Sequence, residues 1–448
     1  MKTFYRGKIF TFNHTATLAN LQGVIPDSLF ADEDQFTFLR DGVIGVEDGI
    51  ITTVGDYSVI KEQIKAEDNF VDYSNKLITP GFIDAHMHAT QTSAVSAYGE
   101  KLLTWLNNYV FPSEVAFKSD ISARREYGIL LNQLFKNGTT SICAYLPSSY
   151  DGADVLFEIT HKYNMRVIMG NTIMTDGSDE LITSPVTSMK ISEKLYQKWH
   201  NTGRISYALT PRFALSCTEE TLKLCQDFVH THPDVYIQSH LCENKNEIQD
   251  TLAKFPWAED YLAVYEKYDL VNDKSIYGHC IHLSESEWSR MVDKGAILAN
   301  CPTSNNYLGS GLFRYDIAIE KDAKFALATD WAAGNTLSMF RVMDDSYKVA
   351  MLNSFKLETL TRWYSATLGS AQALQLDQYI GSLEVGKEAD FIVIDTAANE
   401  LLNYRLESSH DLLDYLFSIS SLGDDRIIDA TYIYGNKVYD VNLPCIQK

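Results

Sequence analysis

Short apolar stretches recur along the middle of the chain, and stretches with helical periodicity lie between them. Eight apolar stretches are rich in Ile, Val, Leu and Tyr, which is typical of buried β-strands. They are Leu77–His88, Thr139–Leu146, Arg166–Met174, Ile205–Phe213, Val235–Glu243, Ser275–Leu283, Ala296–Asn305 and Lys324–Trp331. Helices are expected at Ser188–His200, Thr218–His230 and Ser284–Asp293, and another at Leu357–Leu374 after the last strand. Strands that alternate with helices predict a parallel sheet, and eight of them predict an α/β fold with a closed (β/α)8, TIM-like barrel.

The two ends of the chain have a different pattern. They contain short β patterns with Gly-bearing turns, at Phe4–Phe12 and Val43–Val54 and again at Phe391–Ile394 and Thr431–Val438. We therefore expect residues 1–76 and 380–448 to form two parts of one small β domain, which flanks a barrel of residues 77–379. The first barrel strand follows directly at Leu77, so no flexible linker is expected between them.

Length and charge narrow the class of protein. The 448 residues are 45% hydrophobic, enough for a large core, and barrels of this kind reach more than ~400 residues when they carry insertions. The formal net charge of −21 repels phosphate groups, so neither nucleic acids nor anionic membranes are expected partners. No apolar run approaches the ~18 residues of a membrane span. The N-terminal stretch MKTFYRGKIFTFNHT also lacks the apolar core of a signal peptide.

The cysteines indicate a reducing environment. There are seven, an odd number, and they are widely spaced without a CxxC pair. This pattern argues against both a disulfide framework and a cysteine-ligated zinc site, and it favours a cytoplasmic protein. The seven are Cys143, Cys217, Cys225, Cys242, Cys280, Cys301 and Cys445.

Metal-binding and acid–base side chains occur where the predicted strands end. The first strand ends in His86-Met87-His88, and residues i and i+2 of a strand point to the same face, so both imidazoles would aim at one point. Further groups of this kind lie at the ends of the fifth, sixth and eighth strands: His240 and Glu243, His279 and His282, and Asp330. Because active sites of such barrels lie at the carboxyl ends of the strands, we expect these groups to meet at the barrel mouth.

Three imidazoles and one carboxylate suit a zinc ion with an open position for water. The same donors accept iron or another divalent ion, so they predict a metal site without choosing the metal. A lone histidine is more often structural than a ligand. The histidines that match no strand end are therefore interpreted as structural: His14, His161, His200, His230, His232 and His410.

Several motifs add a resemblance to a known family. "ITPGFIDAHMH" (Ile78–His88), the later His, His and Asp, and "IGSLEVGKEADFIVID" (Ile380–Asp395) together resemble the amidohydrolase superfamily. More narrowly, the chain resembles its guanine deaminase branch. The segments that carry this narrower resemblance span most of the chain in the right order: "HATQ" (His88–Gln91), "LLTWLNNYVFPSE" (Leu102–Glu114), "LTPRFALSC" (Leu209–Cys217), "SHLCEN" (Ser239–Asn244), "CPTSN" (Cys301–Asn305) and "LGDDR" (Leu422–Arg426).

The resemblance implies a reaction and a ligand set. The reaction would be hydrolytic deamination of guanine to xanthine and ammonia, in purine salvage or breakdown. One zinc ion per chain, or iron in its place, would be held by His86, His88, His240 and Asp330. Glu243 would move a proton from water to the purine ring and then to the leaving amine. Asp330 would share this role as ligand and proton acceptor, and His279 would hydrogen-bond the attacking oxygen.

The resemblance also implies a homodimer and a set of residues that bind the purine. Gln91 has an amide that can donate and accept at a purine edge, Arg212 would donate to the purine oxygen or a ring nitrogen, and Phe213 would form an apolar wall. Each has a simpler interpretation. Gln91 could be a solvated loop amide, Arg212 could form a salt bridge under a loop, and Phe213 could pack in the core.

Some residues near the strand ends and in the first loop differ from the family pattern. These differences leave the metal ligands intact but bear on which substrates the protein accepts. The residues that differ are Thr92, Asn300, Asn306, Tyr307 and Trp331. The alternative functions are a deaminase of another amino-substituted heterocycle, such as a pterin, a triazine or adenine, and a non-catalytic scaffold. The set Gln91, Arg212 and Phe213 favours guanine, and the complete ligand set argues against a scaffold. The H-x-E…P-C-x-x-C signature of zinc-dependent nucleic-acid deaminases does not occur.

Overall fold

The structure is a computed structural model that describes residues 1–22, 35–98, 105–115, 117, 120–178 and 181–443. Leu102–Thr104, part of a segment that carries the family resemblance, and Cys445 lie outside these residues.

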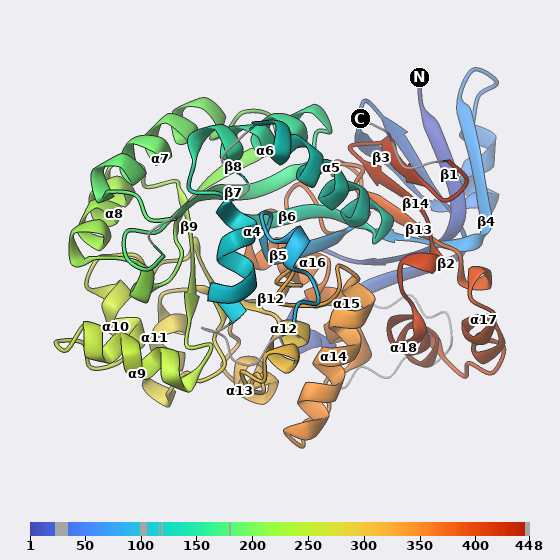
Figure 1. The fold of residues 1–448 in the computed structure, drawn as a ribbon. Coiled ribbons are helices and arrows are strands. Elements are labelled where there is room, and N and C mark those ends of the chain that lie inside the picture. The colour runs from blue at the N-terminus through green and yellow to red at the C-terminus, as the bar shows by residue number, and fades with distance from the viewer. Residues whose placement is uncertain (23–34, 99–104, 116, 118–119, 179–180, 444–448) are drawn as a thin grey trace.

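Eight parallel strands form the centre of the molecule (Figure 1). In chain order each pairs with the next, and β12 contacts β5, which closes the barrel. The strands are β5 (Phe82–His88), β6 (Thr139–Leu146), β7 (Arg166–Ile173), β8 (Ile205–Pro211), β9 (Tyr236–Leu241), β10 (Ser275–His279), β11 (Ile297–Asn300) and β12 (Phe325–Leu327). The predicted α/β barrel is therefore confirmed.

Apolar side chains fill the barrel interior. Each of the eight strands contributes one or more residues to a single buried cluster, and small side chains such as alanine are frequent in it, which allows opposite walls to meet. Its strand members include Ile83, Cys143, Ile168, Ala208, Tyr236, Ile276, Ile297 and Ala326.

Helices surround the barrel, and α4 lies in front of its strands in the view of Figure 1. In the barrel region they are α4 (Phe111–Val115), α5 (Asp120–Lys136), α6 (Tyr150–Lys162), α7 (Pro185–Trp199), α8 (Glu219–Thr231), α9 (Lys245–Lys254), α10 (Tyr261–Glu266), α11 (Glu285–Asp293), α12 (Pro302–Tyr307), α13 (Tyr315–Glu320), α14 (Met339–Leu352), α15 (Thr359–Ser365) and α16 (Leu368–Ala373). Short turns of 3₁₀-helix occur at η2 (Thr92–Ala94) and η5 (Ala214–Ser216), and η3 (Leu106–Val110) is a π-helix.

The expected helix Leu357–Leu374 is in fact two helices, α15 and α16. The backbone leaves the helical conformation at Thr367 (φ −134°, ψ −104°). The carbonyl of Ala366 accepts a hydrogen bond from the backbone N–H of Ile83 in β5 at 3.0 Å. In a continuous helix this carbonyl would instead accept a hydrogen bond from within the helix, so its bond to the first barrel strand accompanies the break between α15 and α16.

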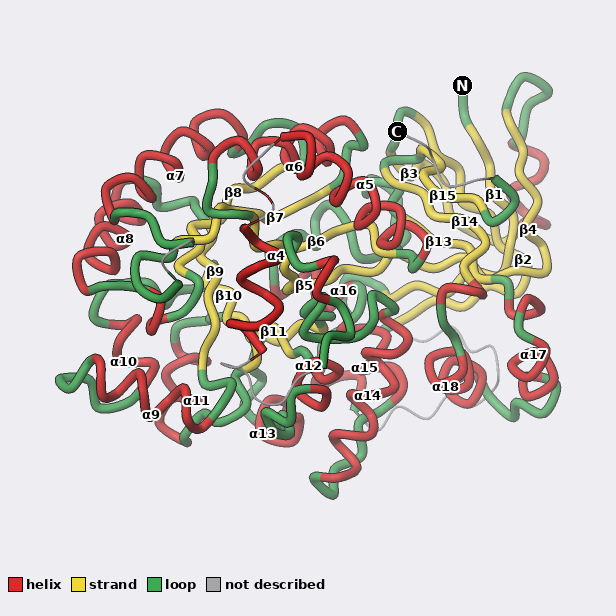
Figure 2. Tube along the Cα trace, viewed as in Figure 1, coloured by secondary structure: helices red, strands yellow, loops and turns green. Residues whose placement is uncertain are grey.

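A second sheet lies on one side of the barrel and is formed by both ends of the chain (Figure 2). Its strand order is β15-β14-β13-β4-β1-β2-β3. The strands are β1 (Thr3–Phe12), β2 (Phe36–Glu47), β3 (Ile50–Asp56), β4 (Asn69–Pro80), β13 (Phe391–Ile394), β14 (Ile428–Ile433) and β15 (Asn436–Asp440). The shorter elements nearby are α1 (Leu18–Leu21), α2 (Tyr57–Ile60), η1 (Lys61–Gln63), η6 (Thr396–Ala398), α17 (Glu400–Leu406), α18 (Leu412–Leu422) and η7 (Asp425–Ile427). The N-terminal and C-terminal parts join where β4 pairs with β13, which confirms a flanking β region built from both termini.

The predicted strand Leu77–His88 is divided between the two sheets. Leu77 pairs with Ile394 in the small sheet, whereas Phe82 pairs with Thr139 in the barrel. Gly81 lies between these two parts of the predicted strand. A side chain does not fit there, because a Cβ at this position would lie 2.2 Å from the hydroxyl oxygen of Thr140. The sheets therefore meet at Gly81, and the division into domains at residues 76 and 379 stays a prediction.

Other predicted strands end earlier than expected. β11 ends at Asn300 because Pro302 begins α12, and β12 ends at Leu327 rather than at Trp331. The predicted strand Thr431–Val438 is a hairpin, β14 and β15. The residues beyond the barrel strands form the loops at the carboxyl end of the barrel. Among the described residues no helix combines the length and the apolar character that a membrane span needs.

Candidate active site

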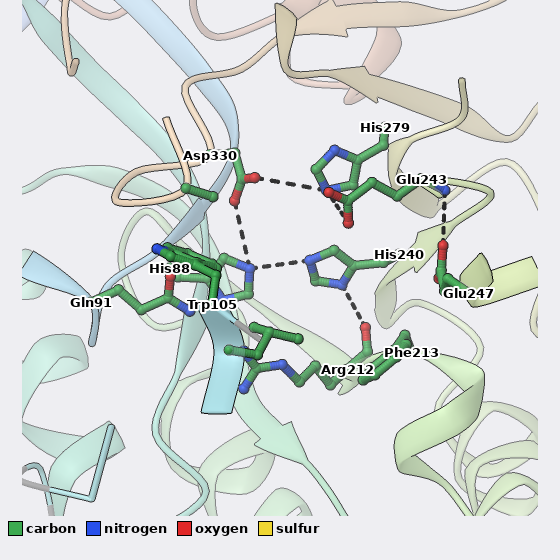
Figure 3. Close-up of a pocket in the computed structure, with 12 residues that line it drawn as sticks. His88, Gln91, Trp105, Arg212, Phe213, His240, Glu243, Glu247, His279 and Asp330 are labelled. Atoms are coloured by element: carbon green, nitrogen blue, oxygen red, sulfur yellow. Dashed lines mark hydrogen bonds and ion pairs between the residues drawn. The ribbon is translucent and has the colours of Figure 1, made fainter. Parts of the chain in front are cut away.

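The four predicted metal ligands lie together at the carboxyl end of the barrel, and Figure 3 shows three of them, His88, His240 and Asp330. His88 Nε2 and His240 Nε2, from opposite strands β5 and β9, are 3.1 Å apart. Asp330 Oδ1 lies 3.6 Å from His86 Nε2 and 3.7 Å from His88 Nε2. All four side chains are buried. Barrel closure thus brings three imidazoles and one carboxylate to one point.

The backbone around these ligands is built to admit them. A Cβ on Gly278 in β10 would lie 2.7 Å from the ring carbon Cε1 of His86, so the glycine leaves room for the imidazole. Asp330 has a left-handed backbone (φ 46°), and its N–H donates to the carbonyl of His86 at 2.9 Å. Left-handed backbone at a non-glycine residue is uncommon and marks constrained sites. Ser304 Oγ donates to Asp330 Oδ2 at 2.7 Å and orients the carboxylate.

The donor atoms fit a divalent metal ion. Both ring nitrogens of His86 and Oδ1 of Asp330 are buried without a hydrogen-bond partner in the described part of the chain, an arrangement that costs free energy unless something else contacts them. Burial lowers the pKa of His86, His88 and His240, so the imidazoles are neutral. Burial alone would raise the pKa of Asp330, but the imidazoles hold it well below its ordinary value. Neutral imidazoles beside a carboxylate are the protonation states that a metal requires.

A second hydrogen bond sets the tautomer of one imidazole. His240 Nδ1 donates to the backbone carbonyl of Arg212 at 2.6 Å. The other nitrogen, Nε2, therefore has its lone pair directed at the cluster, as in many metal-binding histidines.

Glu243 and His279 lie next to the cluster. Glu243 follows β9 after Cys242, whose left-handed backbone (φ 52°) turns the chain toward the barrel mouth. Glu243 Oε2 is 3.5 Å from His279 Nε2, and His279 Nε2 is 3.7 Å from Asp330 Oδ2. Ser310 Oγ donates to Glu243 Oε1 at 3.2 Å, and His279 Nδ1 contacts Asn305 Oδ1 at 2.9 Å.

The electrostatics of this group suit proton transfer. Burial raises the pKa of the Glu243 carboxyl. Burial would lower the pKa of His279, but the carboxylates of Glu243 and Asp330 outweigh it and raise this pKa. Three ionisable groups with shifted pKa values in one buried site form a candidate for acid–base catalysis.

A pocket opens beside these groups and contains the predicted purine-binding residues. Three of the ligands line it together with Glu243 and His279, and the rest of its lining is Gln91, Trp105, Leu106, Arg212, Phe213, Glu247 and Ala333. Gln91 and Arg212 are buried rather than solvated, and Phe213 is half-buried at the pocket wall. The structure thus brings together all nine residues proposed from the sequence.

Both polar side chains of this wall share one partner, Glu114 in α4. Gln91 Nε2 donates to Glu114 Oε1 at 2.9 Å, and Arg212 Nη1 donates to Glu114 Oε2 at 2.7 Å. The salt bridge considered as the simpler role of Arg212 is therefore present, in addition to its place in the pocket. Glu114 and Trp105 were missed as site residues, although both belong to the segment "LLTWLNNYVFPSE" that carries the resemblance.

Other histidines stay outside the site. His282, at the end of the sixth predicted strand, contacts the carbonyl of Ser310 through Nε2 at 2.8 Å and does not line the pocket. Four of the histidines interpreted as structural contact carboxylates elsewhere, in the pairs His14–Glu384, His200–Asp234, His230–Asp269 and His232–Glu193.

The departures from the family pattern have partners of their own. Trp331 Nε1 donates to Thr92 Oγ1 at 3.1 Å, so two of the departures contact each other. Asn300 hydrogen-bonds Tyr315, and Tyr307 donates to the carbonyl of Ala97. Asn306 is exposed. None of the five is among the residues that line the pocket in the described ranges.

Comparison with known proteins agrees with this geometry. The amidohydrolase family model matches residues 77–438. Guanine deaminase from Escherichia coli is 39% identical over 406 residues, which cover 90% of this chain and 92% of that protein. The solved structure of E. coli guanine deaminase superposes with a TM-score of 0.93 and 35% identity, covering 99% and 100% of the two chains. A guanine deaminase from C. acetobutylicum, solved with guanine in its active site, has a TM-score of 0.85 and 28% identity, with 98% and 100% covered.

Proposed function

The chain belongs to the amidohydrolase family, and we propose that it is a guanine deaminase, which hydrolyses guanine to xanthine and ammonia. The observation that carries this function is the convergence of two kinds of residue in one buried pocket. The metal ligands His88, His240 and Asp330 line this pocket with Glu243, and Gln91 and Arg212 line it as well. The match to guanine deaminases over about nine-tenths of the chain supports it.

The proposed metal is one zinc ion per chain, held by His86, His88, His240 and Asp330, with iron as the alternative. The donors are nitrogen and oxygen without thiolate, which suits a catalytic zinc site. Cys301 Sγ also lies near this group, but burial raises the pKa of its thiol, so it stays protonated and is a poor ligand. When bound, the ion lowers the pKa of a coordinated water so that hydroxide is available near neutral pH.

Glu243 is the proton shuttle of the proposed mechanism. Its carboxylate takes a proton from the attacking water and delivers it to a ring nitrogen of guanine, which makes the amino-bearing carbon more electrophilic. The water oxygen adds to that carbon. A second proton then reaches the amino group, the carbon–nitrogen bond breaks, and ammonia leaves. The raised pKa of Glu243 makes its carboxylate a better proton acceptor than an exposed one, which suits a group that takes up a proton and then returns it.

Asp330 and His279 assist this transfer. Asp330 Oδ2, which accepts from Ser304 and lies 3.7 Å from His279 Nε2, is placed to accept the second proton of the attacking water. His279, anchored through Nδ1 to Asn305, directs Nε2 toward both carboxylates and can hydrogen-bond the attacking oxygen. Both groups act from fixed positions, which lowers the entropy cost of the reaction.

Guanine is favoured over other amino-substituted heterocycles. Gln91, Arg212 and Phe213 form the wall beside the acid–base groups, and the five departures from the family pattern lie outside the described pocket lining. An activity panel tests this. Metal-replete protein is incubated with guanine, adenine, pterins and triazines, and ammonia release is measured. Guanine is expected to be the best substrate. Release from another compound, with guanine untouched, would leave only the family assignment standing.

The cellular setting also belongs to this proposal. Six cysteines lie in the described residues, and all six are unpaired thiols, which supports action in the reducing cytoplasm. The homodimer implied by the family resemblance stays a prediction. Size-exclusion chromatography with light scattering on the full chain would test it.

A further inference from the structure

We propose that Glu114 is a positioning residue that decides which atom of the Gln91 amide faces the substrate. Through this choice it makes the pocket select a purine that presents an N–H group to Gln91. The inference rests on the proposed function, because it concerns how the same pocket recognises guanine.

The carboxylate of Glu114 accepts hydrogen bonds from two side chains of the pocket. Glu114 is buried at the end of α4, and each of its oxygens has a different partner, Gln91 Nε2 at 2.9 Å and Arg212 Nη1 at 2.7 Å. An ionised carboxylate can only accept hydrogen bonds. The NH₂ group of Gln91 must therefore face Glu114, and an amide flip would place two acceptors against each other.

The other end of the amide then faces away from Glu114. Gln91 Oε1 is buried and has no hydrogen-bond partner within the residues that the structure describes. A buried acceptor without a partner is unfavourable, and an N–H group of a bound ligand would satisfy it. Gln91 lines the pocket, and Figure 3 shows its side chain among those that surround it.

Arg212 contributes hydrogen-bond donors to the pocket, whereas Gln91 contributes an acceptor. Glu114 holds the guanidinium through Nη1, and Arg212 offers five N–H donors but no acceptor. The pocket wall thus presents one fixed acceptor and one fixed donor. Guanine has N–H groups as well as a carbonyl and unprotonated ring nitrogens, so it can satisfy both. A ligand with an acceptor opposite Gln91 would leave two acceptors unpaired.

A purely structural role for Glu114, as an anchor of α4 on Arg212, is the competing explanation. The two roles differ when the carboxylate and the amide are exchanged. Glu114→Gln alone lets position 114 donate, so the Gln91 amide can reverse and present NH₂ to the substrate. Gln91→Glu alone places two carboxylates against each other. Together, the substitutions restore one N–H donor between the two positions and again direct an oxygen into the pocket.

The test measures kcat/KM for guanine, metal content and thermal stability for the parent, both single variants and the double variant. Each single substitution should lower kcat/KM by about 10- to 100-fold, the usual effect of an unpaired buried polar group. Adding Glu114→Gln to Gln91→Glu should raise kcat/KM by at least tenfold over Gln91→Glu alone. A structural anchor predicts the reverse, because the two losses would then multiply.

Glu388→Gln is the matched control, since Glu388 is a buried carboxylate that accepts from Arg166 and Arg204 outside the pocket. It should leave kcat/KM for guanine within about twofold of the parent, even if stability falls. Because a gain of activity on adding a substitution cannot come from misfolding, the rescue decides the matter even where Glu114→Gln folds poorly. If the parent deaminates guanine but the double variant is no more active than Gln91→Glu, the proposed role of Glu114 is wrong. A parent that releases no ammonia from guanine overturns the proposed function instead.

Discussion

Replacement of Glu243 by Gln removes the proposed proton shuttle and little else. The amide has nearly the same size as the carboxylate and still offers an oxygen to Ser310 Oγ, which donates to Glu243 Oε1 at 3.2 Å in the parent. Glu243 is not among the side chains that could hold the metal. The variant should therefore keep its fold, its metal and its ability to bind guanine.

The expected loss is in the chemical step. A positioned general acid–base contributes about 10²- to 10⁴-fold to the rate, which is about 3 to 5 kcal/mol of transition-state stabilisation. The position of Glu243 favours a substantial effect, because the carboxyl is buried and lies 3.5 Å from His279 Nε2, so bulk water is a poor substitute. The proton moves only as the transition state forms, so the loss should appear in kcat rather than in KM.

Three measurements on one preparation separate the possible roles. Metal is quantified by elemental analysis, guanine binding by calorimetry, and kcat by ammonia release. A shuttle predicts full metal, retained binding and a kcat reduced by about 10²- to 10⁴-fold. Loss of metal would instead make Glu243 a ligand. A kcat close to that of the parent would refute the mechanism.

Three further predictions concern the metal site, the pocket and one carboxylate outside the site. His86→Ala should abolish stoichiometric metal binding, whereas His230→Ala, at an exposed surface pair, should not; elemental analysis of both variants checks this. Arg212→Ala should lower kcat/KM for guanine by about 5- to 150-fold, the equivalent of the ~1–3 kcal/mol of an unpaired buried group, while metal content stays unchanged; equal activity would remove Arg212 from the pocket assignment. Partial burial would raise the pKa of Glu384, but its hydrogen bonds and the Lys387 ammonium lower it to about 2 from 4.5. Because the folded-state pKa is depressed, the ionised Glu384 carboxylate stabilises the folded state above pH 4.5, and this stabilisation is lost as pH falls toward 2. Denaturant titrations at pH 5 and pH 3 should show a smaller loss of unfolding free energy in Glu384→Gln than in the parent.

The barrel strands were predictable because each is a local pattern. Thr139–Leu146 in the barrel and Phe391–Ile394 in the flanking sheet both have the predicted bounds, since a buried strand is a continuous apolar run whose ends are marked by turn residues. Predictions failed where tertiary contacts override the pattern. The helix predicted over Leu357–Leu374 is interrupted where the carbonyl of Ala366 accepts a hydrogen bond from β5.

The ends of the strands were less predictable for a related reason. Lys324–Trp331 reads as one strand, but pairing stops at Leu327. Beyond it, Asp330 and Ala332 adopt left-handed backbone conformations that direct Asp330 into the site. Such conformations are unfavourable for these residues and persist only because surrounding contacts impose them.

By itself the sequence determined the fold class and the residues that approach the barrel mouth. The alternation of elements is local, and a barrel places the carboxyl ends of its strands together. The family resemblance added Gln91 and Arg212. Only the tertiary structure decided that Glu114 holds both of them and that Thr92 meets Trp331. These partners are 23, 98 and 239 residues apart along the chain. No local periodicity encodes such contacts, because they exist only once the barrel has closed and β12 lies beside β5.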